Sequence, residues 1–298
     1  MMAPVIIFAF DRAVHLQRTI EALQKNIGAD MTEVFVFVDV SDEPEHAVGV
    51  GEVRNYLSAF EKIHGFKSLH IEYANAHRGL ANSVIYGVSK VIKKYGQAIV
   101  VEDDLVTSSD FLDYMNQALQ YYKNEENIWS ISGYSFPMKS LKMYPHDIFY
   151  SYRGCSWGWA TWENRWDTVD WEVKNFSAFL MDKKWQKRFN RGGSDLTFLL
   201  CKQMEGERDS WAIRWCFSQS NQEKYTVYPC KSKVKNIGCD GTGTHCDVSD
   251  EYNTNLYDDM KPTEFEKIQL DRKVCREFYL KYSDTVWKKI KRTLFYKR

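Results

Sequence analysis

Three adjacent carboxylates, Glu102, Asp103 and Asp104, are the residues of this sequence best suited to chemistry. They directly follow the apolar run Ala98–Val101, which we expect to be a buried strand. Carboxylates this close repel one another unless a cation or hydrogen-bond donors compensate. A divalent cation, Mn²⁺ or Mg²⁺, would do so and would also bridge a diphosphate. The alternative is a solvated acidic turn before the helix that begins near Ser108–Asp110.

Charged residues also follow the other apolar runs of the first hundred residues. They are Asp11 and Arg12 after Val5–Phe10, Asp39 after Val34–Val38, and the Asn75–Arg78 loop after Leu69–Tyr73. In open parallel sheets, ligands bind outside the carboxyl ends of the strands. Packing alone does not explain charge at every one of these ends. The pattern therefore indicates a ligand site along one edge of a sheet.

These side chains need a sheet that brings the strand ends together. The four apolar runs alternate with helical patterns at His15–Lys25, Val53–Ile63 and Leu80–Tyr95. Continuous apolar strands alternating with helices are typical of a parallel sheet covered on both faces. Further strands are expected at Ile128–Gly133 and Thr226–Pro229. The prediction is an α/β fold with a Rossmann-like mixed, mainly parallel sheet and helices on both faces.

The length fits one large domain with an appendage. We expect a domain over 1–262, with a nucleotide-sugar half of about 1–133 and an acceptor half of about 134–262. Residues 263–298 would form a C-terminal helix and tail. Thr263 as N-cap and Glu266 as its capping-box partner predict a helix from there to about Tyr282.

Composition excludes some partners and compartments. The 40 basic and 40 acidic residues give a net charge of zero, so a surface built to coat nucleic acid is not expected. Seven cysteines without a CxxC pair indicate reduced, mostly buried thiols. The opening run Pro4–Phe10 is too short for a signal peptide or a membrane span. These features predict a cytoplasmic protein.

The motifs together resemble the glycosyltransferases of the GT-A fold, specifically the inverting N-acetylglucosaminyltransferase I-like branch. The likeness spans roughly residues 4–240. It rests on the opening strand at Pro4–Arg12, the EDD segment and its helix at Ala98–Tyr114, the Gly-Trp element at Ser156–Trp159, and Asp209–Trp211 at the family's Asp-Asp-Trp. The second half also resembles bacterial sugar transferases of surface-polysaccharide pathways, through Ser210–Trp215 and Asn236–His245.

The resemblance implies a donor site along the strand ends. Asp104 would hold the metal directly, and Glu102 and Asp103 would contact the ribose or sugar of the donor. His245, in the glycine-rich segment that follows Asn236, would complete the metal shell; an ordinary loop histidine explains it equally well. A structural zinc site there is not expected, because no second ligand pair accompanies Cys239.

The resemblance also implies residues for the nucleotide. Arg12 and Asp39 would hold the base and ribose of the donor. His77 and Arg78 lie in the Asn75–Gly79 loop, where related enzymes wrap the base. The alternative for Arg12 is a surface ion pair, which its position just past the first strand disfavours.

Asp209 would be the catalytic base of an inverting transfer. Such a transfer needs one carboxylate to take the proton of the acceptor hydroxyl, because the diphosphate leaves as a metal-bound anion. The alternative is a helix N-cap preceding Trp211. One or two of Trp157, Trp159 and Trp162 would line an acceptor groove, unless all three are core.

The expected activity is transfer of a sugar from a nucleoside-diphosphate sugar, with a UDP-sugar favoured, to a hydroxyl of a glycan or lipid-linked glycan. One alternative is a sugar-nucleotide nucleotidyltransferase, although the phosphate loop of those enzymes is missing after Phe10. The other is a non-catalytic nucleotide- or glycan-binding module, which gives no reason for the three carboxylates and Asp209.

The last segment, Val286–Arg298, has the pattern of a basic amphipathic helix. Its apolar side carries Trp287, Ile290, Leu294 and Phe295, surrounded by Lys and Arg. Such a helix suits the surface of an anionic membrane. We therefore expect a peripheral location on the inner face of the cell membrane. The alternative is a helix that packs its apolar side on the catalytic domain.

Overall fold

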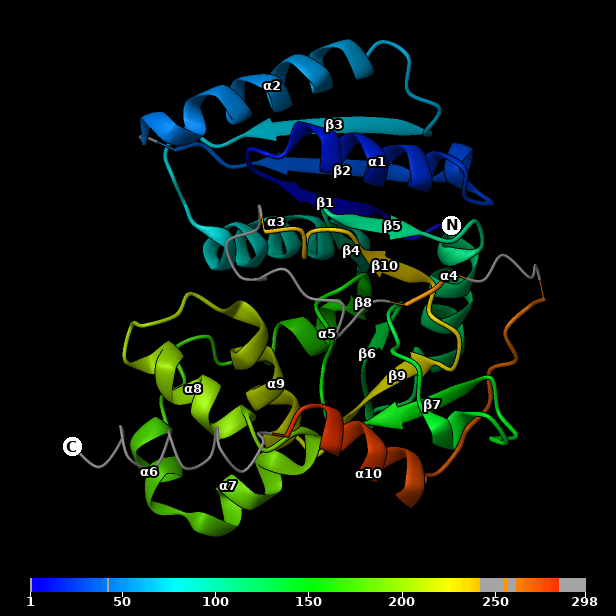
Figure 1. Cartoon of the computed structure of the whole chain (residues 1–298), viewed down its shortest axis with the longest axis vertical. Coiled ribbons are helices and arrows are strands. Elements are labelled where there is room, and N and C mark those ends of the chain that lie inside the picture. Colours follow the sequence, from blue (N-terminus) through cyan, green and yellow to red (C-terminus); the bar gives the residue numbers. More distant parts are fainter. Residues whose placement is uncertain (1, 42, 242–253, 257–260, 284–298) are drawn as a thin grey trace.

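The computed structural model describes residues 2–41, 43–241, 254–256 and 261–283. An eight-stranded sheet, ordered β3-β2-β1-β4-β8-β6-β9-β7, runs through the molecule (Figure 1). Its first four strands are parallel, so their carboxyl ends share one edge. They are β1 (Val5–Ala9), β2 (Glu33–Val38), β3 (Ser68–Tyr73) and β4 (Gln97–Glu102). The predicted Rossmann-like half is confirmed.

The second half of the sheet is mixed. β8 lies antiparallel between β4 and β6, β9 runs parallel to β6, and β7 is the antiparallel edge. These strands are β6 (Ile128–Ser132), β7 (Ile148–Ser151), β8 (Trp159–Trp162) and β9 (Tyr225–Pro229). A mixed, mainly parallel sheet of this kind confirms the GT-A fold class.

Helices cover both faces of the sheet because alternate strand residues point to opposite sides. In β1, Val5 and Ile7 belong to one core, whereas Ile6 and Phe8 belong to the other. The first core is closed by α1 (Ala13–Gln24), α2 (Pro44–Phe60) and α4 (Phe111–Tyr122). The second is closed by α3 (Leu80–Tyr95), α5 (Glu163–Trp166) and α9 (Trp211–Asn221).

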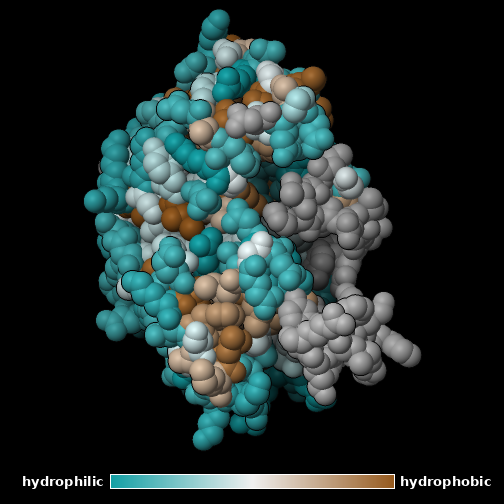
Figure 2. All heavy atoms as spheres, turned by 90° about the vertical axis from the view of Figure 1, so that its left-hand side faces the viewer, coloured by the Kyte–Doolittle hydropathy of each residue, from teal (hydrophilic) through white to brown (hydrophobic). Residues whose placement is uncertain are grey.

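A smaller helical cluster packs on α9, at the lower left of Figure 1. Phe179, Phe189, Leu200 and Phe217 fill its own apolar core. Its helices are α6 (Phe176–Met181), α7 (Lys183–Phe189) and α8 (Leu196–Met204). Short 3-10 turns are η1 (Ala29–Met31), η2 (Lys139–Leu141) and η3 (Asn190–Gly192). The face turned to the left of Figure 1 is largely hydrophilic (Figure 2).

The tryptophans are mostly core. Trp159 is 1% exposed and stacks on Trp166 and Trp211, and Trp162 is 3% exposed. Trp159 packs in the second core and Trp162 in the first, so neither of these two candidates faces an acceptor groove. Trp157 is half-buried and keeps that possibility.

The C-terminal helix begins later than predicted. Residues 261–270 are not helical, and α10 (Arg272–Lys281) is capped by Asp271, which accepts hydrogen bonds from the backbone of Lys273 and Val274. The Thr263–Glu266 capping box does not form. Tertiary contacts explain this, because Glu266 pairs with His146 and its carbonyl accepts a bond from the Tyr122 hydroxyl. Among the residues described, no helix has the length and apolar character needed to cross a bilayer.

The expectation of reduced, mostly buried thiols holds only in part, because Cys216 is buried whereas the other four described free thiols are half-buried. Five are free thiols: Cys155, Cys201, Cys216, Cys230 and Cys275. Cys239 is disulfide-bonded, which corrects the expectation of reduced thiols. A search for CxxC spacing cannot detect a pair at another spacing.

Candidate active site

The acidic triplet lies at the carboxyl end of β4, beside the end of β1. After Asp104 the chain turns into β5 (Leu105–Thr107), which pairs antiparallel with β10 (Val234–Asn236). This small sheet brings a segment from the far end of the sequence onto the triplet. The backbone nitrogen of Ile237 donates to the Asp104 carbonyl at 2.9 Å.

Gly238 packs directly on the triplet. A Cβ at this position would lie 2.0 Å from Oδ2 of Asp104 and 2.8 Å from Nη1 of Arg12. No larger residue fits unless the carboxylate or the loop moves. In the sequence, Gly238 is only one residue of the glycine-rich segment that follows Asn236, and no local pattern indicates its contact with Asp104.

Arg12, which the resemblance assigned to the base and ribose of the donor, forms ion pairs with the triplet. Its Nη2 lies 2.5 Å from Oδ1 of Asp103 and 2.9 Å from Oδ2 of Asp104. The Thr19 hydroxyl, from α1, donates to the Asp103 carbonyl at 2.7 Å and fixes the turn. The site is therefore a buried cluster of three carboxyls and one guanidinium.

Burial raises the pKa of two of these carboxyls, Glu102 and Asp103. Desolvation, with the neighbouring Asp104 and Asp103, raises the pKa of Glu102 to about 8. Desolvation also raises the pKa of Asp103 to about 7, against the opposing effect of Arg12. Burial alone would lower the pKa of Arg12, but its two carboxylate partners raise it. One cation does not balance the cluster, so a further positive charge would stabilise it.

Asp104 carries the atom best placed for such a charge. Its Oδ1 is buried and has no hydrogen-bond partner within the described part of the chain, whereas Oδ2 is paired with Arg12. An uncompensated buried oxygen is costly, and a hard cation takes oxygen ligands. Asp104 therefore fits a divalent ion that also has ligands from a bound substrate. The other suggested ligand, His245, lies outside the described residues.

Another group of metal-ligand type lies on the surface. Glu43, Glu45 and His46, where α2 begins, have ligand atoms within 4.8 Å of one another. His46 also pairs with Asp11, with Nδ1 and Oδ2 2.6 Å apart, and its ring lies 5.0 Å from that of Phe10. Sequence reasoning missed this pairing. Acidic side chains are ordinary at a helix start, so the group carries no metal assignment here.

Asp39 is buried and holds the loop before α3. Its carboxylate accepts hydrogen bonds from the backbone nitrogens of Arg78 at 3.0 Å and Gly79 at 2.9 Å. His77 is within 3.2 Å of the same carboxylate and also bonds the Val40 carbonyl. Asp39 thus shapes the loop that the resemblance assigned to the base.

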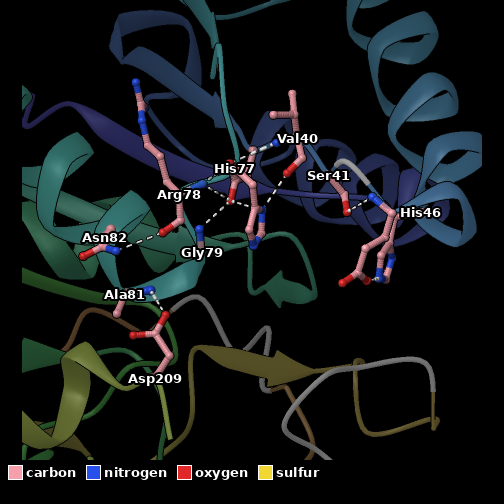
Figure 3. A network of polar contacts seen from close by, with 11 residues as sticks. Val40, Ser41, His46, His77, Arg78, Gly79, Ala81, Asn82 and Asp209 are labelled. Atoms are coloured by element: carbon pink, nitrogen blue, oxygen red, sulfur yellow. Dashed lines mark hydrogen bonds and ion pairs between the residues drawn. The ribbon is translucent and has the colours of Figure 1, made fainter. Parts of the chain in front are cut away.

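The side chain of Arg78 extends away from this network (Figure 3). Its guanidinium lies 4.1 Å from the ring centre of Tyr86 and 3.9 Å from Glu72. The structure therefore does not bring the Arg78 guanidinium to the acidic triplet. Its backbone, in contrast, is fixed by Asp39.

Asp209 directly precedes the N-cap of α9, and its side chain faces the start of α3 (Figure 3). Its Oδ2 accepts a hydrogen bond from the backbone nitrogen of Ala81 at 3.1 Å. The N-cap of its own helix, α9, is Ser210. Asp209 therefore caps a helix of the first half rather than its own, and its side chain remains exposed. Asp209 thus links the second half of the molecule to the start of α3.

The mixed sheet and the charged edge at the ends of β1 and β4 define a glycosyltransferase of the GT-A class. Residues 1–191 match the GNT-I family, and the chain belongs to this family of glycosyltransferases. A relative from Arabidopsis thaliana is alpha-1,3-mannosyl-glycoprotein 2-beta-N-acetylglucosaminyltransferase. It is 22% identical over an alignment of 183 residues, and the match covers 56% of this chain and 39% of that protein. The chain thus spans well under half of that relative.

Solved structures show similar folds at low identity. One is the mannosyltransferase PcManGT from Pyrobaculum calidifontis in complex with GDP-Man and Mn²⁺, with TM-score 0.40 and 10% identity over 75% of this chain and 69% of that one. Another is S. aureus TarS 1-349, with TM-score 0.43 and 9% identity over 78% of this chain and 59% of that one. No conclusion about activity rests on either likeness.

Proposed function

We propose that the protein transfers a sugar from a nucleoside-diphosphate sugar, most favourably a UDP-sugar, to a hydroxyl of a glycan or lipid-linked glycan. The observation that carries this proposal is the unpartnered buried Oδ1 of Asp104, beside Arg12, at the ligand-binding edge of the sheet. Family membership supports sugar transfer. The transferred group is a hexosyl or N-acetylhexosaminyl group, the latter being the group named for the Arabidopsis relative.

In this proposal Asp104 binds Mn²⁺ or Mg²⁺. The bound ion supplies positive charge that stabilises the departing diphosphate. Arg12 orients Asp103 and Asp104 and adds a fixed positive charge beside the phosphates. Glu102 and Asp103 contact the ribose or the sugar.

Asp209 is the proposed base of an inverting transfer. One of its carboxylate oxygens bonds the start of α3, and the side chain is exposed, so the other oxygen is accessible to an acceptor hydroxyl. A general base takes the proton of the acceptor hydroxyl as that hydroxyl attacks the sugar. The Asp39-held loop between β3 and α3 would receive the nucleoside through its backbone, including that of Arg78.

We also propose that the protein works in the cytoplasm, on the inner face of the cell membrane. The support is the basic amphipathic pattern of Val286–Arg298. These residues lie outside the described part of the chain. An acceptor linked to a membrane lipid would then be within reach of the enzyme.

A panel of nucleotide sugars, incubated with Mn²⁺ and glycan acceptors, tests the proposal. Release of a nucleoside diphosphate together with a glycosylated product is the expected result. A parallel incubation contains a sugar phosphate and a nucleoside triphosphate in place of the nucleotide sugar. Release of pyrophosphate there would instead show a nucleotidyltransferase. Binding of nucleotide sugars without turnover across the panel would show a binding module.

A further inference from the structure

A basic hollow lies on the second half, outside the donor site. It has a volume of about 610 Å³ and lies between α7, η3, α10 and Tyr152, the residue after β7. We call it the basic hollow. Five cationic side chains line it: Lys184, Lys187, Arg188, Arg191 and Arg276. No acidic side chain of the described residues lines it, so its charge is strongly positive.

The carboxylates closest in sequence to these cationic residues form hydrogen bonds with the backbone outside the basic hollow. Asp182 accepts hydrogen bonds from the backbone of Lys184 and Trp185, at the start of α7. Asp271 does the same at the start of α10, and Glu277 bonds the backbone of η2 at 2.7 Å. Glu223 forms an ion pair with Arg188 at 3.5 Å and so compensates one of the five cations. The cluster therefore gains little compensation from the protein itself.

Two of the arginines are already oriented. Nε of Arg188 is buried and has no hydrogen-bond partner within the described chain. The guanidinium of Arg191 lies 4.1 Å from the ring centre of Tyr152, and its Nε donates to the Arg188 carbonyl at 3.2 Å. An arginine held by packing loses less freedom on binding an anion. The unpartnered Nε adds a donor that an anionic ligand would satisfy.

We propose that the basic hollow binds a phosphate group carried by the acceptor glycan. Arginine and lysine clusters bind phosphate through charge-assisted hydrogen bonds. Tyr279, which also lines the hollow, offers a ring face on which an adjacent sugar would stack. The proposal rests on the proposed glycosyl transfer and narrows its acceptor to a glycan phosphate.

The chain itself connects this hollow to the donor edge. Tyr152 precedes Trp159 by a short loop, and Trp159 pairs with Val100 of β4, two residues before Glu102. A fully extended chain between Tyr152 and Trp159 spans at most about 25 Å. An oligosaccharide of a few units covers such a distance. One acceptor molecule would thus place a phosphate in the hollow and a hydroxyl near the donor.

Hydrogen exchange provides a local test that requires neither donor nor turnover. Peptides covering α7 and α10 are followed while the full chain is titrated with inorganic pyrophosphate or glucose 1-phosphate in metal-free, low-salt buffer. The test variant is Lys187→Ala/Arg276→Ala, in which both changed side chains are exposed. The control is Lys62→Ala/Lys93→Ala, which removes the same charge from exposed positions of the first half.

The expected result is protection of α7 and α10 by both phosphates in the wild type and the control. In the Lys187→Ala/Arg276→Ala variant, half-protection should need about tenfold more ligand, as expected for two lost ion contacts. Unchanged protection in that variant would overturn the proposal. Protection by phosphatidylglycerol vesicles but by neither soluble phosphate would overturn it too, because the hollow would then be a membrane contact. A failed donor panel with intact phosphate protection would reject the transferase activity alone.

Discussion

Gly238 packs so closely on Asp104 that any side chain at this position would displace the carboxylate. We predict that Gly238→Ala weakens Mn²⁺-dependent UDP binding by about tenfold or more. Its Cβ would overlap Oδ2 of Asp104, and relieving such overlap typically costs about 1–3 kcal/mol. Calorimetric titration of UDP with and without Mn²⁺ measures this. Gly51→Ala is the matched control, since a Cβ there meets nothing within 4 Å. Equal UDP affinity in both variants would contradict the assignment.

Asp209 has two candidate roles, and two substitutions separate them. We predict that Asp209→Asn retains UDP affinity but lowers transfer by about 10²–10⁴-fold, the usual contribution of a general base. Asparagine keeps an oxygen that accepts the hydrogen bond from Ala81, so the cap of α3 survives. Steady-state rates at saturating donor measure the loss.

Asp209→Ala removes the cap as well as the base. It should lose a similar amount of transfer and, in addition, about 1 kcal/mol of stability in thermal unfolding. Near-normal turnover of Asp209→Asn beside a destabilised Asp209→Ala would leave Asp209 with the capping role only.

The sequence predicted which residue types gather at the donor edge but not how they pair. The charged residues that follow the apolar runs were enough to predict that Arg12, Asp103 and Asp104 lie along one edge of the sheet. The structure adds the ion pairs between them. The bond from Ala81 to Asp209 joins residues 128 positions apart. No local pattern encodes such a contact. The resemblance suggested Arg78 as a contact to the base because of its loop. The sequence did not show that its guanidinium contacts Tyr86 and Glu72.

At the scale of elements, the regular alternation of the first half was readable from the sequence. β3 begins at Ser68 and α3 spans Leu80–Tyr95, close to the predicted ranges, because their apolar periodicity is uninterrupted. β5, β7, β8 and β10 were not predicted. They are three or four residues long, too short to show a period, and long-range pairing defines them.

The start of the C-terminal helix shows tertiary contacts overriding a local signal. The Thr263–Glu266 pattern is present, but Phe265 packs against Tyr114 and Tyr122, and Glu266 pairs with His146. These contacts hold the segment extended across α4. A capping box contributes only about 1 kcal/mol, so a few such contacts are enough to outweigh it.

The docking of α10 depends on Glu277, which leads to a pH prediction. Burial alone would raise the pKa of Glu277, but hydrogen bonds from the backbone of Ser140 and Lys139 lower it below its usual 4.5. The stabilisation should therefore be complete above pH 4.5 and be lost as the pH falls below it.

Glu277→Gln should lower the free energy of unfolding by about 1 kcal/mol at neutral pH, because charge-assisted bonds weaken. The difference from the wild type should shrink as the pH drops below 4.5. Urea unfolding at several pH values measures it, with Glu264→Gln, an exposed position on the preceding segment, as the control. A difference that does not change with pH would argue against an ionised Glu277.

At the scale of the whole molecule, the C-terminal tail should set the location of the enzyme. We predict that the full chain co-sediments with anionic vesicles and that a chain ending at Asp284 does not. Each basic residue near an anionic surface contributes about 1 kcal/mol. Binding should weaken as salt is added. Equal binding by both chains, or none at low salt, would exclude the tail as an anchor.

The two halves of the molecule meet where chemistry is proposed. β8 of the second half pairs with β4, and Asp209 bonds the start of α3. The donor edge and the proposed base are thus fixed relative to each other by the sheet and one helix. This arrangement is what a single displacement between donor and acceptor requires.

We expect Asp104 to bind a metal ion without which the protein cannot transfer the sugar of a nucleoside-diphosphate sugar. The most direct measurement is nucleoside diphosphate release from the donor chosen by the panel, with Mn²⁺ or with EDTA, for wild type and Asp104→Ala. Asp30→Ala, an exposed acidic position, is the control. We predict Mn²⁺-dependent release in the wild type and control, and none above background in folded Asp104→Ala. Equal release in EDTA, or full activity of Asp104→Ala, would contradict the account.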